Sequence, residues 1–145
     1  MNTIFPSRFL KLALIADAVV SGAVATLQLL AAGWLSELLN LPKALLINTG
    51  VFFVGYTISL VVLTRSTAVW SPIIGVVVVG NIGWAIACVG LLASGMVSPN
   101  VLGVAFVAVQ AVAVLAFAAM EYAGLKASQS AGTTRALARD NHQRT

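Results

Sequence analysis

Four long apolar segments follow one another along the chain, separated by short polar stretches. They extend over about residues 9–33, 44–63, 72–94 and 101–122, and no charged residue or histidine occurs between Ser66 and Met120. Crossing the hydrocarbon core of a bilayer takes about 20 apolar residues. Backbone polar groups in lipid must be satisfied within their own segment, so each segment is predicted to be a helix. The pattern therefore predicts an all-α fold, an antiparallel bundle of four transmembrane helices with short loops.

The same pattern divides the chain into a transmembrane domain, residues 1–126, and a polar tail, residues 127–145. The tail is rich in Ser, Gln, Thr and Arg and is predicted to be disordered or loosely bound to the membrane surface. Between the first two segments, Leu35 to Lys43 is predicted to form a short helix at the membrane interface. The first segment follows Arg8 and Lys11 as a secretory signal would, but it continues to Gly33, which is too long for the apolar part of a signal. It is therefore expected to remain as the first helix.

Composition agrees with a membrane protein. Hydrophobic residues make up 60% of the chain and charged residues only 8%, whereas soluble domains carry about 25% charged residues. A transmembrane β-barrel would need alternating polarity in segments of about ten residues, and the run from Val76 to Val79 is apolar on every face.

The placement of Lys and Arg predicts the orientation. The net charge is +4, but the positive residues lie at the ends of the apolar segments, so nucleic-acid binding is not expected. With four spans, both termini lie on one side, and only Lys43 lies on the other. The termini share their side with seven basic residues: Arg8, Lys11, Arg65, Lys126, Arg135, Arg139 and Arg144. Cytoplasmic loops carry the excess of positive charge, so both termini are predicted to be cytoplasmic.

Ionisable residues inside a span are costly and are candidates for function. Asp17 is the clearest case, and Ser21 and Gln28 follow it at +4 and +11, on the same helix face. Two hypotheses are open for Asp17. Its carboxyl group could form an ion pair with Lys11 or Arg65, or it could bind and release protons.

The other segments each have one polar stripe. Asn81, Trp84 and Cys88 share a face of the third, and Gln110 and Glu121 share a face of the fourth; in the second, Asn48, Tyr56 and Ser59 do so. The candidate proton-binding or ligand-binding residues are therefore Asp17, Gln28, Asn81, Trp84, Gln110 and Glu121.

A structural role is the competing interpretation for most of these residues. Asn81 and Gln110 are expected to hydrogen-bond to each other across the third and fourth helices, a contribution of about 0.6 kcal/mol. Asp17, Asn81, Trp84, Gln110 and Glu121 are all expected in the interior of the bundle. Glu121 is also close enough to the end of its span that it could pair with Lys126. Trp84 could stack on a ligand or pack in the core.

The residues needed for several kinds of chemistry are missing from the spans. The only histidine, His142, is in the tail, and Cys88 is the only cysteine. The spans therefore offer no ligand set for haem or zinc. The chain also has no phosphate-binding loop and no Ser/His/Asp set. No catalytic residue, metal or cofactor is predicted, and an enzyme is not expected.

Several motifs are shared with other proteins. The arrangement Arg8-x2-Lys11-x5-Asp17, then Asn81-x2-Trp84, then Leu102-Gly103-x-Ala105-Phe106-x3-Gln110 and Glu121-Tyr122 resembles a set of small uncharacterised bacterial four-span integral membrane proteins. The resemblance covers the four spans and implies a multi-pass protein of the bacterial inner membrane, without implying a reaction.

Two classes of function are consistent with these features. The first is a non-enzymatic protein that assembles, either with itself or as an accessory subunit of another membrane protein. Small residues such as the pairs Ala18/Gly22 and Gly83/Ala87 favour close helix packing, within the bundle or with a second copy. The alternative is a small proton-coupled transporter of a hydrophobic or cationic small molecule that uses Asp17. The small multidrug transporters are similar in having four helices and a carboxylate in the first, but they are shorter and share no wider motif.

Overall fold

The structure, a computed structural model, describes the backbone of residues 3–143 and the side chains of residues 3–132. Seven elements follow one another in this part of the chain: β1 (Thr3–Ile4), α1 (Arg8–Leu30), α2 (Ala32–Leu39), α3 (Lys43–Arg65), β2 (Val69–Trp70), α4 (Ser71–Ala93) and α5 (Val101–Gln143).

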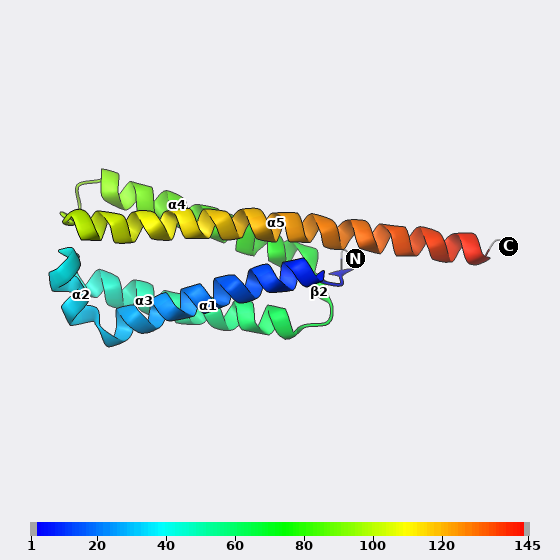
Figure 1. Cartoon of the computed structure of the whole chain (residues 1–145), viewed down its shortest axis with the longest axis horizontal. Helices are drawn as coiled ribbons and strands as arrows, with labels where there is room; N and C mark the ends of the chain where they lie inside the picture. The colour runs from blue at the N-terminus through cyan, green and yellow to red at the C-terminus, as the bar shows by residue number, and fades with distance from the viewer. Residues whose placement is uncertain (1–2, 144–145) are drawn as a thin grey trace.

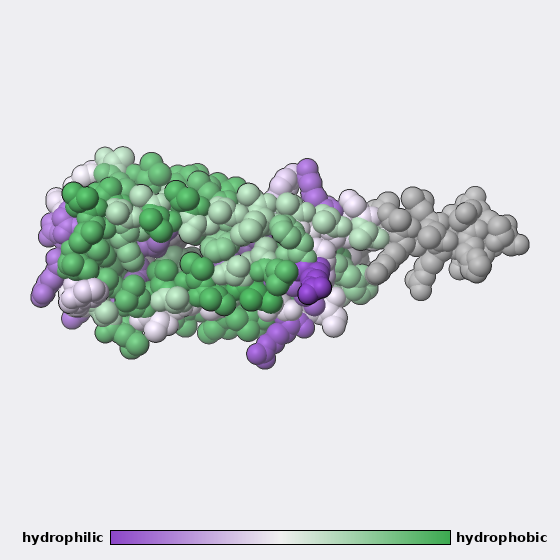
Figure 2. All heavy atoms as spheres, in the orientation of Figure 1, coloured by the Kyte–Doolittle hydropathy of each residue, from purple (hydrophilic) through white to green (hydrophobic). Residues whose placement is uncertain are grey.

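Among the described residues, α1, α3, α4 and the part of α5 from Val101 to Gly132 are long and apolar enough to cross a membrane. Each of the first three has 23 residues and is therefore about 34 Å long at 1.5 Å per residue. The surface view shows a broad apolar band between polar groups near the two ends of the bundle (Figure 2). The predicted all-α, multi-pass membrane fold is confirmed.

The observed helix ends agree with the prediction to within three residues for α1, α3 and α4. The fourth span begins at Val101 as predicted, but α5 continues past Tyr122 to Gln143 and projects beyond the bundle (Figure 1). The predicted disorder of the tail therefore does not match the structure as far as Gln143, and residues 144–145 lie outside the described part. Residues 123–143 contain no proline and several alanines, and alanine favours continuation of a helix.

The helices form two hairpins. α1 packs along α3, α4 packs along α5, and the two hairpins join mainly through contacts between α1 and α5. α3 and α4 have almost no backbone proximity. The order around the bundle is therefore α3, α1, α5, α4, with an opening between the first and the last.

The N-terminal segment closes one end of the bundle, which we call the terminal end. β1 pairs with β2 in an antiparallel ladder, with Ile4 opposite Val69. Ser7 caps α1, and its backbone N–H donates to the Ser128 hydroxyl oxygen at 2.9 Å. The contact with Ser128 explains why α5 remains packed on the bundle beyond the predicted end of its span.

The opposite end, which we call the α2 end, is held by two asparagines. Asn40 ends α2 with a left-handed backbone, φ 52°, and donates to the Ser98 carbonyl oxygen. Asn100 donates to the Leu38 carbonyl oxygen at 2.7 Å and caps α5 by accepting from Gly103 N–H at 2.9 Å. These bonds tie α2, the predicted short helix, to the α4–α5 connection.

Candidate functional site

Each of the four membrane helices contributes one polar side chain to a buried group that we call the polar cluster. It consists of Asp17 from α1, Tyr56 from α3, Asn81 from α4 and Glu121 from α5. Asp17 and Glu121 are 0% exposed and Asn81 is 2% exposed. The cluster lies at the place where the two hairpins meet.

Asn81 connects the cluster. Its amide nitrogen donates to Asp17 Oδ2 at 3.0 Å and to Glu121 Oε2 at 3.1 Å. The Tyr56 hydroxyl oxygen lies 2.7 Å from Asp17 Oδ2 and 3.1 Å from Asn81 Oδ1. Ser21 donates to the other oxygen of Asp17 at 2.8 Å. Both amide hydrogens of Asn81 and both oxygens of Asp17 are therefore engaged.

Two acidic groups share this small volume. Because both carboxyl groups accept from the same nitrogen, their bonded oxygens are about 6 Å apart at most, a distance at which one charge disfavours another of the same sign. Within residues 3–132, neither carboxyl group has a cationic partner at ion-pair distance. A buried carboxylate without a compensating charge is expensive. The bundle therefore buries two ionisable side chains within one hydrogen-bonded group.

Neither of the ion pairs that the sequence left open for Asp17 and Glu121 is formed. Asp17 is bonded to the neutral side chains described above, and not to Lys11 or Arg65. Glu121 is fully buried, and the Lys126 ammonium lies instead over the Tyr122 ring, 4.7 Å from its centroid. The predicted position of Glu121 in the bundle interior is confirmed, and because α5 continues past Tyr122, Glu121 does not lie at a helix end.

The predicted hydrogen bond between Asn81 and Gln110 is also wrong. Asn81 lies at the same position along the bundle axis as Glu121, to which it is hydrogen-bonded, and α4 and α5 are antiparallel. Gln110 precedes Glu121 by eleven residues, about 16 Å along the helix at 1.5 Å per residue. It is half-buried and lies outside the polar cluster.

Gln28 is buried at a second polar contact, nearer the α2 end. Its Oε1 accepts from the Thr49 hydroxyl at 3.1 Å, which joins α1 to α3. This contact lies eleven residues beyond Asp17 on α1 and is separate from the polar cluster.

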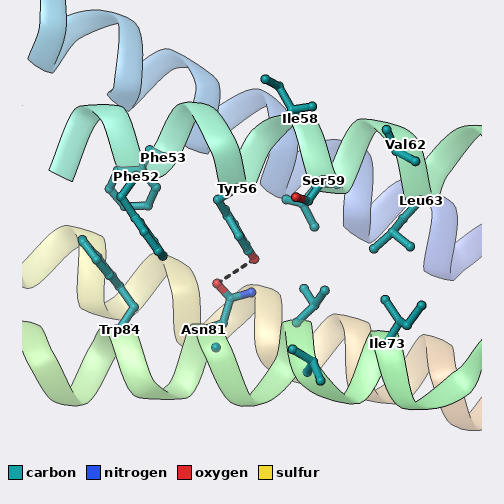
Figure 3. Close-up of a pocket in the computed structure, with 14 residues that line it drawn as sticks. Phe52, Phe53, Tyr56, Ile58, Ser59, Val62, Leu63, Ile73, Asn81 and Trp84 are labelled. Carbon is teal, nitrogen blue, oxygen red and sulfur yellow. Dashed lines mark hydrogen bonds between the residues drawn. The ribbon is translucent and has the colours of Figure 1, made fainter. Parts of the chain in front are cut away.

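A cleft of about 570 Å³ lies between α3 and α4 beside the polar cluster. At one end, Trp84 stacks on Phe52 with ring centroids 5.2 Å apart and meets Phe53 edge-on at 4.7 Å. At the other end the lining is aliphatic, and the hydrogen bond between Tyr56 and Asn81 crosses between the two helices (Figure 3). The cleft is lined by Phe52, Phe53, Tyr56, Ile58, Ser59, Leu60, Val62, Leu63, Ile73, Val76, Val77, Gly80, Asn81 and Trp84.

Both hypotheses for Trp84 have support in this geometry. Its ring packs against the two phenylalanines, and it also forms one wall of the cleft. Its indole nitrogen is buried and has no hydrogen-bond partner among the described residues, and the same is true of Glu121 Oε1. The Trp84 nitrogen belongs to a residue that lines the cleft, and Glu121 Oε1 belongs to the polar cluster.

The structure thus brings together Asp17, Asn81 and Glu121 and places Trp84 beside them. The important residue that the candidate set omitted is Tyr56. A phenol in the middle of a span could have indicated a buried polar role for Tyr56. The sequence, however, placed Tyr56 on one face with Asn48 and Ser59, and both of these are exposed in the structure.

Among residues 3–132, no group of three His, Cys, Asp or Glu side chains is arranged to hold a metal ion. Comparison of the chain with protein-family models, with curated proteins and with solved structures finds no match in any of the three.

Proposed function

We propose that this membrane protein is a small, non-enzymatic, proton-coupled transporter in which the Asp17–Glu121 pair carries the proton. One observation supports this most strongly: two fully buried carboxyl groups from different helices bind one amide, with no cationic partner among the described residues. Ionisable residues placed in this way inside the membrane mark proton relays and substrate paths.

The substrate class follows from the charge of the site. A carboxyl pair that releases a proton becomes more negative and then favours a cation in its place. The adjoining cleft has a volume of about 570 Å³, within the range of about 300–1,000 Å³ that is typical of small-molecule sites. A hydrophobic or cationic small molecule suits both features.

The proposal includes a location in the bacterial inner membrane with both termini in the cytoplasm. The positive side chains Arg8, Lys11, Arg65 and Lys126 lie towards the terminal end, and Lys43 begins α3 at the α2 end. This distribution supports the orientation by the positive-inside rule.

Transport is tested with proteoliposomes that contain a pH-sensitive dye and are diluted into ethidium, a permanently charged aromatic cation. For the native protein we expect ethidium entry to expel protons, so that the lumen becomes more alkaline. Asp17→Asn should abolish the pH change, because the amide cannot release a proton.

The matched control is Glu37→Gln, which makes the corresponding change at an exposed position in α2. It should retain the pH change. No pH change for the native protein, either with ethidium or with a panel of lipophilic amines, would contradict the proposal. A loss of flux in both variants would do the same.

Self-assembly is the second candidate function, and one observation favours it. Gly83 and Ala87 are exposed on α4, and a Cβ at Gly83 would meet no atom within 4 Å. Gly22, by contrast, faces Thr57 within the bundle. Small residues four apart on an open face let a second helix approach closely, so α4 is the helix through which we propose that copies of the chain, or another membrane subunit, associate.

A further inference from the structure

We propose that the cleft between α3 and α4 binds a lipophilic ammonium ion that enters sideways from the bilayer, and that the Tyr56 hydroxyl couples this binding to the protonation of Asp17. The inference rests on the proposed transport function and adds to it the ligand class, the route of entry and the coupling residue.

The route of entry follows from the packing of the hairpins. α1 and α5 hold the two hairpins together, whereas α3 and α4 stand apart along the cleft. The side chains at its margin, Ile58, Val62, Ile73 and Val76, are exposed and aliphatic. In a membrane these side chains face hydrocarbon, so the cleft opens to lipid along this margin and admits a molecule that is already dissolved in the bilayer.

The ligand class follows from the lining and the charge. The aliphatic part of the lining suits an alkyl or aromatic body. The inner side of the cleft is formed by Tyr56 and Asn81, which are bonded to two carboxyl groups without a cation. A ligand with a positive charge complements this side, and Asn81 Oδ1 is an acceptor for an ammonium N–H.

The Tyr56 hydroxyl has one hydrogen and two acceptors within reach, Asp17 Oδ2 at 2.7 Å and Asn81 Oδ1 at 3.1 Å. When Asp17 is ionised, the hydroxyl donates to the carboxylate, because hydrogen bonds to charged acceptors are the stronger ones. Asn81 Oδ1 is then free to accept from the ligand. The negative charge and the free acceptor are therefore present together.

Protonation of Asp17 reverses this arrangement. The carboxyl O–H donates to the Tyr56 oxygen, and the Tyr56 hydrogen turns to Asn81 Oδ1. The ligand then loses both its acceptor and the attraction of the charge. One proton enters as one ammonium ion leaves, so the charge of the site is conserved.

The other groups around Asp17 do not replace Tyr56 in this role. From α5, Glu121 accepts from the same amide and is the second carboxyl group of the pair. From α4 only the non-titratable Asn81 reaches Asp17, and from α1 only Ser21 does so. Lys11 forms no hydrogen bond or ion pair with it.

The test measures binding of 4-phenylbutylamine to the protein in lipid nanodiscs at about pH 6 and about pH 8 by calorimetry. Where binding requires an ionised Asp17, the affinity of the native protein should rise by up to about tenfold per pH unit over part of this range. The trimethylammonium analogue, which has no N–H, should show a smaller dependence on pH.

Tyr56→Phe leaves Asn81 Oδ1 free at both pH values. At pH 8 the affinity of this variant should stay within about threefold of the native value, a smaller change than the tenfold that corresponds to about 1.4 kcal/mol. Its affinity should also depend less on pH than that of the native protein. Tyr122→Phe is the control, since it makes the same change at an exposed tyrosine of α5 that is not among the residues lining the cleft. It should change neither quantity.

The location is tested separately with Gly80→Leu, which fills the cleft at a position where a Cβ would meet no atom within 4 Å. This variant should lose binding while retaining its thermal stability, and Gly55→Leu, on the exposed side of α3, should retain both. Equal native affinity at the two pH values, or full pH dependence in Tyr56→Phe, would overturn the coupling. Binding that survives Gly80→Leu would overturn the site.

The outcomes are distinguishable from those of the transport assay. Binding that depends on pH and on Tyr56, without proton flux in proteoliposomes, would retain this site and reject transport. Proton flux together with pH-independent binding would retain the transporter and reject the Tyr56 switch.

Discussion

Asn81 is the residue on which the arrangement of the polar cluster depends, because its amide is bonded to three of the four helices. An amide suits this position better than a charged group would. It donates to two carboxyl groups and accepts from a hydroxyl while remaining neutral, and a buried neutral group that is fully hydrogen-bonded avoids the desolvation penalty of a charge. The proton count of the cluster is therefore left to Asp17 and Glu121.

Gly124 sets the separation of α1 and α5 at the terminal end. A Cβ at this position would lie 2.8 Å from Leu10 Cα and 2.9 Å from Leu10 Cβ. The obstacle is backbone, which cannot rotate away. Gly124→Ala should therefore lower the stability by about 1–3 kcal/mol, the usual cost of overpacking, and lower the midpoint of thermal unfolding in detergent.

Gly132→Ala is the matched control on the same helix, where a Cβ would meet nothing within 4 Å. It should leave the midpoint unchanged or raise it, since alanine is the better helix former by up to about 1 kcal/mol. Equal effects of the two substitutions would show that α5 does not pack on α1 this closely.

At the scale of the elements, the outer face of α4 differs from that of α3. α4 presents Gly83, Ala87 and Gly90 on its exposed side among large side chains such as Ile86 and Val89. The exposed side of α3 has Gly55 among large side chains such as Val51 and Ile58. Helix association in lipid depends on close packing, because lipid tails are as apolar as the side chains. The α4 face is therefore the better candidate for contact with a second copy.

Gly83→Ile tests this face. If copies of the chain associate through α4, the bulky side chain should shift the population from dimer to monomer, as measured by light scattering in mild detergent or by native mass spectrometry. Gly55→Ile, which adds the same side chain at an open position on α3, should leave the distribution unchanged. A native protein that is monomeric in lipid nanodiscs would rule out self-assembly through this face.

At the scale of the whole molecule, the two ends of the bundle are built differently. The terminal end joins β1, β2 and the part of α5 that follows Glu121, whereas the α2 end is closed by α2 and the α4–α5 connection (Figure 1). α5 projects only from the terminal end. If the termini are cytoplasmic, this extension lies on the cytoplasmic side.

Reporter fusions test the orientation. An alkaline phosphatase fused after Thr145 should be inactive and a fluorescent protein at the same position should fluoresce, because seven of the eight Lys and Arg residues share that side. An alkaline phosphatase inserted near Asn40 should be active. The opposite pattern would invert the topology and, with it, the direction of proton movement in the proposed transport.

The end of the fourth span shows where sequence patterns lose their predictive value. The apolar segment ends near Tyr122, as predicted, but the helix does not, because the residues that follow favour helix and Ser128 contacts the N-terminal segment. Hydropathy reports where a chain leaves the hydrocarbon. It does not report where the helix stops, since that depends on propensity and on contacts that are distant in sequence.

The sequence by itself determined the number of spans, their boundaries to within a few residues and the burial of Asp17 and Asn81, because hydrocarbon imposes a length, a helical backbone and a high cost on exposed polar groups. Only the tertiary structure decided which of the buried groups meet. Periodicity assigns a residue to a helix face but leaves the position of one helix along another undetermined, and a shift of one turn is about 5.4 Å. Close contacts such as that of Gly124 with Leu10 select this position. They bring Glu121 to Asn81 and leave Gln110 outside the cluster.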